Sequence, residues 1–260
     1  MSNIQSYIHP DAKIGNNVVI EPFVYIDSDV VVGDNCWIGP HATLFKGSRI
    51  GKNCKIFPGA VIGAIPQDLK FEGEYTTAEI GDNTTVREAV TVNRGTKVKN
   101  KTAVGNNVLL MACSHVGHDC IIGNNVIVAN AVLFGGEVMV DDFAIIGGAS
   151  AIHQFVHIGA HTMLSGGSLV SKDIPPFVKA GRLPISYCGV NSVGLRRRNF
   201  SNETIQEIQD IYRMLFMSGL NYGDATEYIE TEMPASKERD EILLFIKNSK
   251  RGIMKGYFGQ

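Results

Sequence analysis

The sequence has no long hydrophobic run and no excess of charge of one sign. No run of about 18 apolar residues occurs, so we expect no membrane span. The opening residues, MSNIQSYIHP, carry no charged segment followed by an apolar one, so we expect no signal peptide. A formal net charge of −2 over 260 residues gives no electrostatic reason to expect nucleic acid as a partner. These absences predict a cytoplasmic globular protein.

Cysteine is also scarce, with five residues and no Cys-x-x-Cys pair, so zinc and redox roles have little support. If the chain is built of stacked repeats, Cys36 and Cys54 could come within disulfide reach. In a reducing compartment, a free thiol acting as a small buried hydrophobe is the better interpretation.

What the sequence does contain is an aliphatic residue at every sixth position. The series runs from Ile8 to Ile62, and the same register returns at Ile80 and continues to Val170. Of these 26 repeat positions, 25 are Ile, Val or Leu and the other is Phe134. A period of six fits neither an amphipathic helix nor a simple alternating strand. It is typical of a short β segment with an inward aliphatic residue and a tight corner.

This pattern is the hexapeptide repeat, and it resembles the left-handed parallel β-helix found in many acyltransferases. Three hexads would form one coil, so residues separated by three hexads would stack, and neighbouring coils would lie about 4.8 Å apart. The predicted fold class is mainly β, with this β-helix over residues 1–190 and a small C-terminal α-helical domain over residues 191–260. The handedness follows from the resemblance.

The stacked coils of such a β-helix form a three-sided prism. The register is interrupted once, and we expect residues 63–79 to leave this prism as an external loop. Asp68 and Glu74 would otherwise occupy inward positions, where unpaired carboxylates are costly. Residues 94–102 are a second candidate for such an excursion, although Val98 keeps the register there. Loops of this kind are disproportionately functional.

Beyond Val170 the repeat stops, and we expect residues 177–190 to form a last irregular coil. From Ser201, a fair N-cap, the spacing of apolar residues predicts a helix that ends at Gly219. A shorter helix is expected near 224–232, and another from Ser236 to Asn248.

Three polar or flexible positions are separated from one another by one predicted coil and should stack on the outside of the prism: His118, Gly136 and Gln154. Histidine is the natural general base near neutral pH, and the adjacent Asp119 could orient its ring. A glycine would bring a bare backbone N–H close to the reacting group, as an oxyanion donor requires. Ordinary polar residues on the coil surface are an equally good interpretation of the spacing alone.

A metal site is the second alternative. His115, His118, His153, His157 and His161 are similar in kind to the histidines of zinc-binding carbonic anhydrases built on this β-helix. Their spacing is not distinctive, and the glycine and glutamine fit acyl transfer better.

Longer motifs narrow the choice: PQDLK at 66–70, VREAVTVNRGT at 86–96, HVGHDC at 115–120, HQF at 153–155 and GLRRR at 194–198. In these motifs the chain resembles the UDP-N-acetylglucosamine O-acyltransferase family, over essentially its whole length. The resemblance implies transfer of a 3-hydroxyacyl group from acyl carrier protein to the glucosamine 3-hydroxyl of UDP-N-acetylglucosamine, the first step of lipid A biosynthesis. It also implies a homotrimer with active sites between prisms, and no metal or other cofactor.

The resemblance assigns roles residue by residue. His118 matches the general base, Asp119 its supporting acid and Gly136 the backbone donor facing the thioester carbonyl. The positions that match substrate-binding residues are Gln67, Asp68, Lys70, His115, His153, Gln154, Asn191, Arg197 and Arg198. Met163 and Gly166 match the acyl-chain pocket, where a glycine leaves room for a long chain.

Three positions depart from the family pattern, with Glu137 and Asn93 in place of frequent histidines and Val193 in place of a common glutamate. They leave acyl preference and details of substrate contact open. The later N-acyltransferase of the pathway carries an N-terminal uridine-binding domain, for which a repeat beginning at Ile8 leaves no room. An enzyme that acylates a 3-amino sugar nucleotide stays an alternative, as does a non-catalytic or zinc-binding hexapeptide protein.

Overall fold

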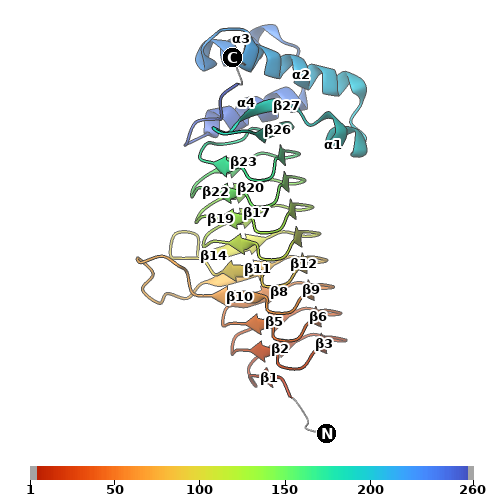
Figure 1. Ribbon diagram of the computed structural model, residues 1–260, viewed down its shortest axis with the longest axis vertical. Helices are drawn as coiled ribbons and strands as arrows, with labels where there is room; N and C mark the ends of the chain where they lie inside the picture. Colours follow the sequence, from red (N-terminus) through yellow and green to blue (C-terminus); the bar gives the residue numbers. More distant parts are fainter. Residues whose placement is uncertain (1–4, 257–260) are drawn as a thin grey trace.

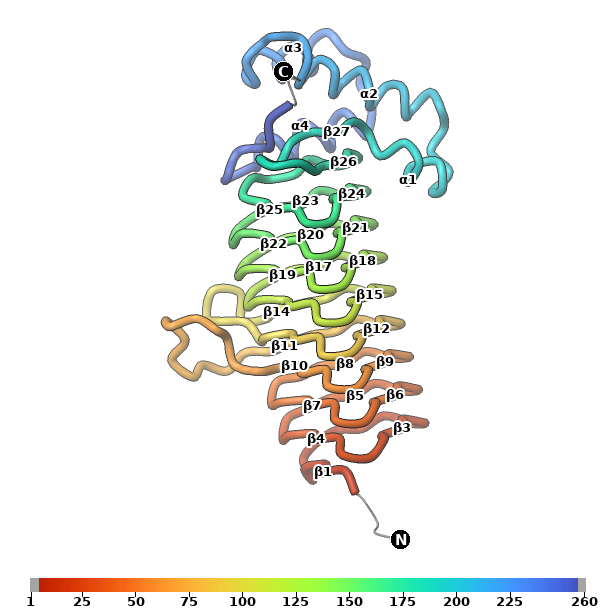
Figure 2. Tube along the Cα trace, viewed as in Figure 1, coloured from red at the N-terminus to blue at the C-terminus, as the bar shows by residue number. Residues whose placement is uncertain are grey.

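The computed structural model describes residues 5–256 and shows a tall three-sided prism of short strands (Figure 1). The chain climbs the prism from its N-terminal end, and four helices lie together at the other end (Figures 1 and 2). Each of the three faces is one sheet, and from β1 to β25 consecutive strands lie on successive faces. Strands that are neighbours within a face therefore come from successive coils.

The first face has nine strands, and all their pairings are parallel. In order they are β1 (Tyr7–Ile8), β4 (Tyr25–Ile26), β7 (Thr43–Leu44), β10 (Val61–Ala64), β13 (Thr91–Asn93), β16 (His115–Val116), β19 (Leu133–Phe134), β22 (Ala151–Ile152) and β25 (Leu169–Val170).

The second face has eight strands: β2 (Lys13–Ile14), β5 (Val31–Val32), β8 (Ser48–Ile50), β11 (Thr77–Ile80), β14 (Lys101–Val104), β17 (Ile121–Ile122), β20 (Met139–Val140) and β23 (His157–Ile158). The third has ten: β3 (Val19–Ile20), β6 (Trp37–Ile38), β9 (Lys55–Ile56), β12 (Thr85–Val86), β15 (Leu109–Leu110), β18 (Ile127–Val128), β21 (Ile145–Ile146), β24 (Met163–Leu164), β26 (Val178–Gly181) and β27 (Ser186–Val190).

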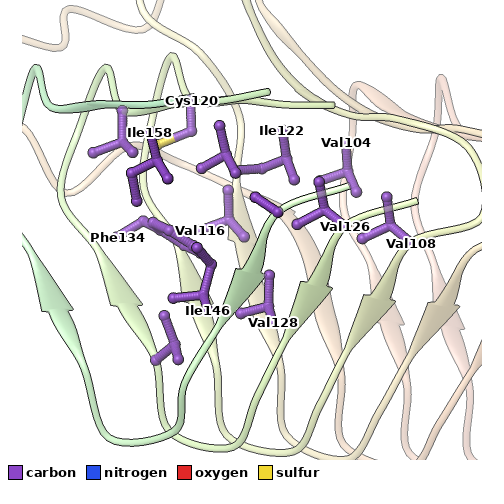
Figure 3. Packing of buried hydrophobic residues seen from close by; sticks show 14 of the residues in the cluster. Val104, Val108, Val116, Cys120, Ile122, Val126, Val128, Phe134, Ile146 and Ile158 are labelled. Atoms are coloured by element: carbon purple, nitrogen blue, oxygen red, sulfur yellow. The ribbon is translucent and has the colours of Figure 1, made fainter. Parts of the chain in front are cut away.

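The interior of the prism is a ladder of the repeat residues. Val116, Phe134 and Ile152 stack in register on the first face and are at most 3% exposed. Figure 3 shows such side chains filling the space between the faces, together with residues four places after a repeat position, such as Cys120 and Val126. Removing these aliphatic surfaces from water stabilises each coil against the next.

The corners use a left-handed backbone conformation that recurs along the repeat. Asn17, Asn35 and Asn125 have φ of 54°, 58° and 56°, and asparagine tolerates this region better than most residues. Asp119 and Glu137 occupy the same corner position, with φ of 60° and 61°. Their place in the coil is thus set by the fold.

Two loops leave the prism side by side (Figure 2). The first is residues 65–76 between β10 and β11, and because of it Val61 pairs with Thr91 instead of the residue one ordinary coil further on. The second is residues 94–100 between β13 and β14, and it likewise lengthens the coil that joins Thr91 to its partner His115. The expectation that Val98 keeps the register is wrong, because this side chain is 61% exposed on the second loop.

At the C-terminal end, the stretch expected to be an irregular coil forms an antiparallel pair of strands, β26 and β27. The helices are α1 (Ser192–Arg197), α2 (Asn202–Met217), α3 (Tyr222–Glu232) and α4 (Lys237–Asn248). Ser201 caps α2 as predicted, with its side chain accepting from the Thr204 N–H, but α2 ends at Met217, before the expected Gly219. The short α1 has no counterpart in the sequence prediction.

The cysteines are free thiols, as expected, and Cys36 and Cys54 are stacked, with the Cys54 N–H donating to the Cys36 sulfur at 3.4 Å. Among the helices in residues 5–256, none combines the length and the apolar character that crossing a lipid bilayer demands.

Candidate active site

A file of three residues on one corner of the prism forms the back of a cleft. His118, Gly136 and Gln154 each follow a strand of the first face, two places after Val116, Phe134 and Ile152. The cleft measures about 380 Å³. Its lining is Gln67, Asn93, His115, Gly117, His118, Leu133, Phe134, Gly135, Gly136, Ala151, Ile152 and Gln154.

His118 and Asp119 form a close pair at this corner. The His118 Nδ1 lies 2.8 Å from the Asp119 Oδ2, and the side chains are 17% and 0% exposed. An ionised carboxylate can only accept hydrogen bonds, so this contact assigns the proton to Nδ1 and leaves Nε2 with a free lone pair. The pair can therefore act as a general base through Nε2.

The second loop holds the Asp119 side chain in place. The backbone N–H groups of Thr96 and Lys99 donate to Oδ1 at 3.0 and 3.1 Å, and the Thr96 hydroxyl donates to Oδ2 at 2.7 Å. The Asp119 N–H donates to the Thr102 hydroxyl at 2.8 Å. Sequence reasoning missed these partners, because Val98 continues the six-residue spacing between Val92 and Val104 and so conceals the loop.

Gly136 lies directly behind the imidazole of His118. A Cβ added to Gly136 would lie 2.4 Å from the His118 Nε2 and 2.5 Å from its Cε1, so the ring occupies the space of a side chain. Among residues 5–256, no acceptor takes the Gly136 N–H. Glycine here thus brings both the ring and a bare backbone donor to the floor of the cleft.

His115 contributes a second imidazole from β16. Its Nδ1 lies 2.7 Å from the Thr91 hydroxyl, and burial lowers its pKa, with the nearby His118 adding to the effect. A lowered pKa keeps His115 neutral around pH 7. Asn93, one of the departures from the family pattern, is buried and donates to the Ile65 carbonyl at 2.8 Å, so it anchors the start of the first loop.

The first loop places only one of its three predicted residues in the cleft. Gln67 lines it, whereas Asp68 accepts the Lys70 N–H at 3.0 Å and stays outside the lining. The Lys70 side chain is exposed. The loop returns to the prism at Tyr75, whose hydroxyl donates to Asp29 Oδ2 at 2.9 Å.

The two loops are joined to each other. Glu74 of the first loop accepts the N–H of Lys97 at 2.9 Å with Oε1 and the N–H of Glu72 at 2.9 Å with Oε2. The backbone N–H groups of Glu74 itself, Glu72 and Lys97 together lower the pKa of the Glu74 carboxyl. The Lys97 ammonium lies 3.5 Å from Glu72, but both side chains are well exposed, so this ion pair adds little.

The remaining predicted residues lie away from the His118 corner in this chain. His153 is exposed, its Nδ1 lies 3.0 Å from the Gln154 carbonyl oxygen, and it borders a separate apolar hollow with Leu169 and Leu183. Met163 and Gly166 lie on and just after β24 of the third face. A Cβ on Gly166 would lie 3.0 Å from the Gly148 oxygen of the coil before.

Asn191 is the N-cap of α1, Arg197 is its last residue and Arg198 is its C-cap. Asn191 is buried, accepts the Gly194 N–H at 3.2 Å and donates to the His161 oxygen at 2.8 Å, so its amide already caps the helix. Arg198 donates to the Phe143 oxygen at 3.1 Å, and burial lowers its pKa. Arg197 is exposed, and within residues 5–256 no acceptor is found for it.

Two further observations concern residues that the sequence left open. Glu137 is half-buried at the corner after Gly136, and its N–H donates to the His118 oxygen at 2.9 Å.

Among the residues that the structure describes, no three or more His, Cys, Asp or Glu side chains come together as a set able to hold a metal ion.

Comparison with known proteins identifies the family of the chain. The bacterial transferase hexapeptide model (six repeats) matches residues 11–46, 29–64 and 101–136. The model for domain 2 of UDP-N-acetylglucosamine O-acyltransferase matches residues 173–254. The acyl-[acyl-carrier-protein]–UDP-N-acetylglucosamine O-acyltransferase of Trichlorobacter lovleyi is 49% identical over 253 residues, covering 96% of this chain and 97% of the relative. That of Aquifex aeolicus is 48% identical over 198 residues, covering 76% of each.

The crystal structure of a UDP-N-acetylglucosamine acyltransferase from Bacteroides fragilis superposes with a TM-score of 0.95 at 56% identity, covering 98% of this chain and all of that one. The fold is thus the left-handed parallel β-helix of the hexapeptide-repeat transferases, as predicted. Within that class, the chain belongs to the UDP-N-acetylglucosamine O-acyltransferase family, and it is an acyltransferase.

Proposed function

We propose that this chain transfers a 3-hydroxyacyl group from acyl carrier protein to the glucosamine 3-hydroxyl of UDP-N-acetylglucosamine, the first step of lipid A biosynthesis. The relatives are named for transfer from an acyl-acyl carrier protein to UDP-N-acetylglucosamine. We include in the proposal a cytoplasmic homotrimer that needs no metal or other cofactor. The observation that carries the chemistry is the His118 ring, held by Asp119 and lying against Gly136.

In this proposal the Nε2 of His118 removes the proton of the sugar hydroxyl as its oxygen attacks the thioester carbon. The Asp119 carboxylate stabilises the imidazolium that forms. The N–H of Gly136 donates to the carbonyl oxygen as it becomes an oxyanion. Collapse of the tetrahedral intermediate breaks the carbon–sulfur bond, and the imidazolium returns its proton to the departing thiolate.

The other predicted residues bind substrate in this scheme. Gln67, His115 and Gln154 line the cleft beside His118, which supports contacts with the sugar and the acyl group. Asp68 and Lys70 follow Gln67 in the first loop and His153 precedes Gln154 in the sequence, and all three lie outside the cleft lining. The free guanidinium of Arg197 suits a phosphate, and Arg198 and Asn191 lie next to it. Asn191, Arg197 and Arg198 are remote from His118 within one chain. We therefore assign them to a site that a neighbouring subunit completes, and we assign Met163 and Gly166 to the acyl-chain pocket of that site.

The test is incubation of the purified protein with UDP-N-acetylglucosamine and 3-hydroxyacyl carrier proteins of several chain lengths, with products resolved by mass spectrometry. We expect one acyl group per sugar nucleotide, attached at the 3-oxygen. A parallel incubation uses the sugar nucleotide with an amino group at that carbon. Product from the amino substrate alone would contradict the proposed acceptor. Absence of any acylated product, together with one tightly bound zinc ion per chain, would contradict the acyltransferase mechanism.

A further inference from the structure

We propose that Thr96 is a positioning residue for the general base, acting through Asp119 from the second loop. The inference rests on the proposed function, because it assigns a role to a residue that touches neither substrate nor His118. Thr96 is 3% exposed and precedes Asp119 in the sequence by more than one ordinary coil. Only the excursion of residues 94–100 from the prism brings the two together.

The direction of the hydrogen bonds at Thr96 is fixed. The N–H of Val98 donates to the hydroxyl oxygen of Thr96 at 3.2 Å. The hydroxyl proton is therefore free to point to Asp119 Oδ2, 2.7 Å away. That same oxygen lies 2.8 Å from the Nδ1 of His118. Thr96 thus orients the carboxylate oxygen that selects the His118 tautomer.

The second carboxylate oxygen is held by the same loop. Oδ1 accepts the N–H groups of Thr96 and Lys99, and the Lys99 ammonium donates to the Asp119 carbonyl oxygen at 2.9 Å. With the side chain of Asp119 fully buried, rotation of its carboxylate would break contacts that water cannot replace. Of the contacts that this loop makes with the Asp119 carboxylate, the Thr96 hydroxyl is the one that a side-chain substitution can remove while the backbone donors stay.

The decisive variant is Thr96→Val, which keeps the branched shape and loses the hydroxyl. We expect kcat for acyl transfer to fall about tenfold, the loss of one hydrogen bond to a charged group, while KM for UDP-N-acetylglucosamine changes less than about twofold. Thr96→Ser should recover kcat to within about threefold of the unaltered enzyme. Thr96→Ala, which also lacks the hydroxyl but is smaller, serves if valine prevents folding.

The matched control is Thr84→Val. Thr84 is fully buried, and its hydroxyl donates to the Gly105 oxygen at 2.8 Å with no link to Asp119. We expect this control to lose thermal stability and to keep kcat. An equal fall in kcat for both valine variants would overturn the proposal, because a general loss of stability would then explain both.

The second readout does not need activity. In ¹⁵N-histidine-labelled protein, we expect His118 to be protonated on Nδ1 alone, and Thr96→Val to populate the Nε2–H tautomer as well. Wild-type kcat and an unchanged tautomer in Thr96→Val would refute a positioning role. If the unaltered protein acylates no UDP-N-acetylglucosamine, the proposed function fails, and the tautomer comparison still decides whether Thr96 positions the ring.

Discussion

Two histidine–aspartate pairs on the coils have nearly the same distance between ring nitrogen and carboxylate oxygen, but their surroundings differ. His118 and Asp119 are 2.8 Å apart, and the Asp119 side chain is 0% exposed. His157 and Asp141 are 2.9 Å apart, and the Asp141 side chain is 40% exposed. The first carboxylate has further donors from a loop, whereas the second faces solvent.

The two contacts are similarly short, yet only the first pair has the surroundings that our proposed general base requires. The ring of His157 lies 4.5 Å from that of Phe245 on α4, and its backbone N–H donates to Asp173, so this pair joins the prism to the helices. The ring of His118 instead faces a cleft, with a bare backbone behind it. A screened surface pair contributes little, but a buried acid with fixed partners holds one tautomer.

The largest expected effect lies at the centre of the first pair. We expect His118→Ala to lower kcat/KM for acyl transfer by about 10²- to 10⁴-fold, the usual contribution of a general base. His157→Ala, the matched control, should keep kcat/KM within about threefold and lose about 1 kcal/mol of unfolding free energy. Steady-state kinetics measures the loss of activity in each variant, and thermal melts measure the loss of stability. Equal losses of activity in both variants would end the distinction between the two pairs.

The next effect comes from Gly136, which has no equivalent at the His157 pair. In Gly136→Ala the new Cβ would meet the His118 ring, so the ring must leave its present position. A misplacement of about 1 Å can cost about 10²-fold in rate, and we expect kcat to fall about 10- to 100-fold. The thermal midpoint should fall by only a few degrees, since the obstacle is the end of a flexible side chain. Wild-type kcat in this variant would show that the ring position is not critical.

The regular part of this site was predictable from the sequence because the fold is periodic. A spacing of one coil placed His118, Gly136 and Gln154 in a single file, and the repeated aliphatic residues defined the interior. Adjacency in sequence also linked Asp119 to His118. Periodicity converts sequence distance into spatial distance only while the coils continue.

The parts that break the period could not be predicted in the same way. Thr96 reaches Asp119 through a loop whose path depends on its own hydrogen bonds, and Val98 coincides with the register by chance. The short α1 has too few residues for an apolar periodicity and depends on capping by Asn191. The β26–β27 hairpin likewise lacks the aliphatic repeat of the prism.

A smaller effect tests the contact between the two loops, the second of which holds Asp119 of the His118 pair. Glu74→Ala removes the acceptor for the Lys97 N–H and should loosen residues 94–100, which hold Asp119. We expect kcat/KM to fall about three- to tenfold. Glu72→Ala, on the same loop, removes only an exposed ion pair and should stay within about twofold. The comparison fails if the two alanine variants have the same kcat/KM.

A pH test of the first loop follows from the same contact. The pKa of Glu74 lies below its usual value because backbone N–H groups, its own first among them, donate to its carboxylate. A carboxyl group with a lowered folded-state pKa contributes stability above its unfolded pKa and loses that contribution as the pH falls through the folded one. The activity ratio of the unaltered enzyme to Glu74→Ala should therefore be constant near neutral pH and shrink below about pH 4.5. A ratio independent of pH down to acid inactivation would contradict the role of the charged form.

The smallest effect concerns His161, for which residues 5–256 provide no carboxylate within hydrogen-bond distance. His161 is stacked on Phe143 and Phe177, and burial, with Arg198 adding to it, lowers its pKa to about 4. The unfolded chain binds a proton at this residue near pH 6.5, so between pH 6.5 and 4 the unfolded state takes up more protons than the folded state. Stability from this group is complete above that window and declines as the pH falls through it.

His161→Phe should keep the stack of rings and remove the titration, so the thermal midpoint should fall less between pH 6.5 and 4 than in the unaltered protein. His153→Phe replaces an exposed histidine and should leave the decline unchanged. Because His161 is only partly shielded, we expect a difference of a few degrees at most. Identical pH profiles for His161→Phe and the unaltered protein would show that this ring is protonated in the folded and unfolded chains alike.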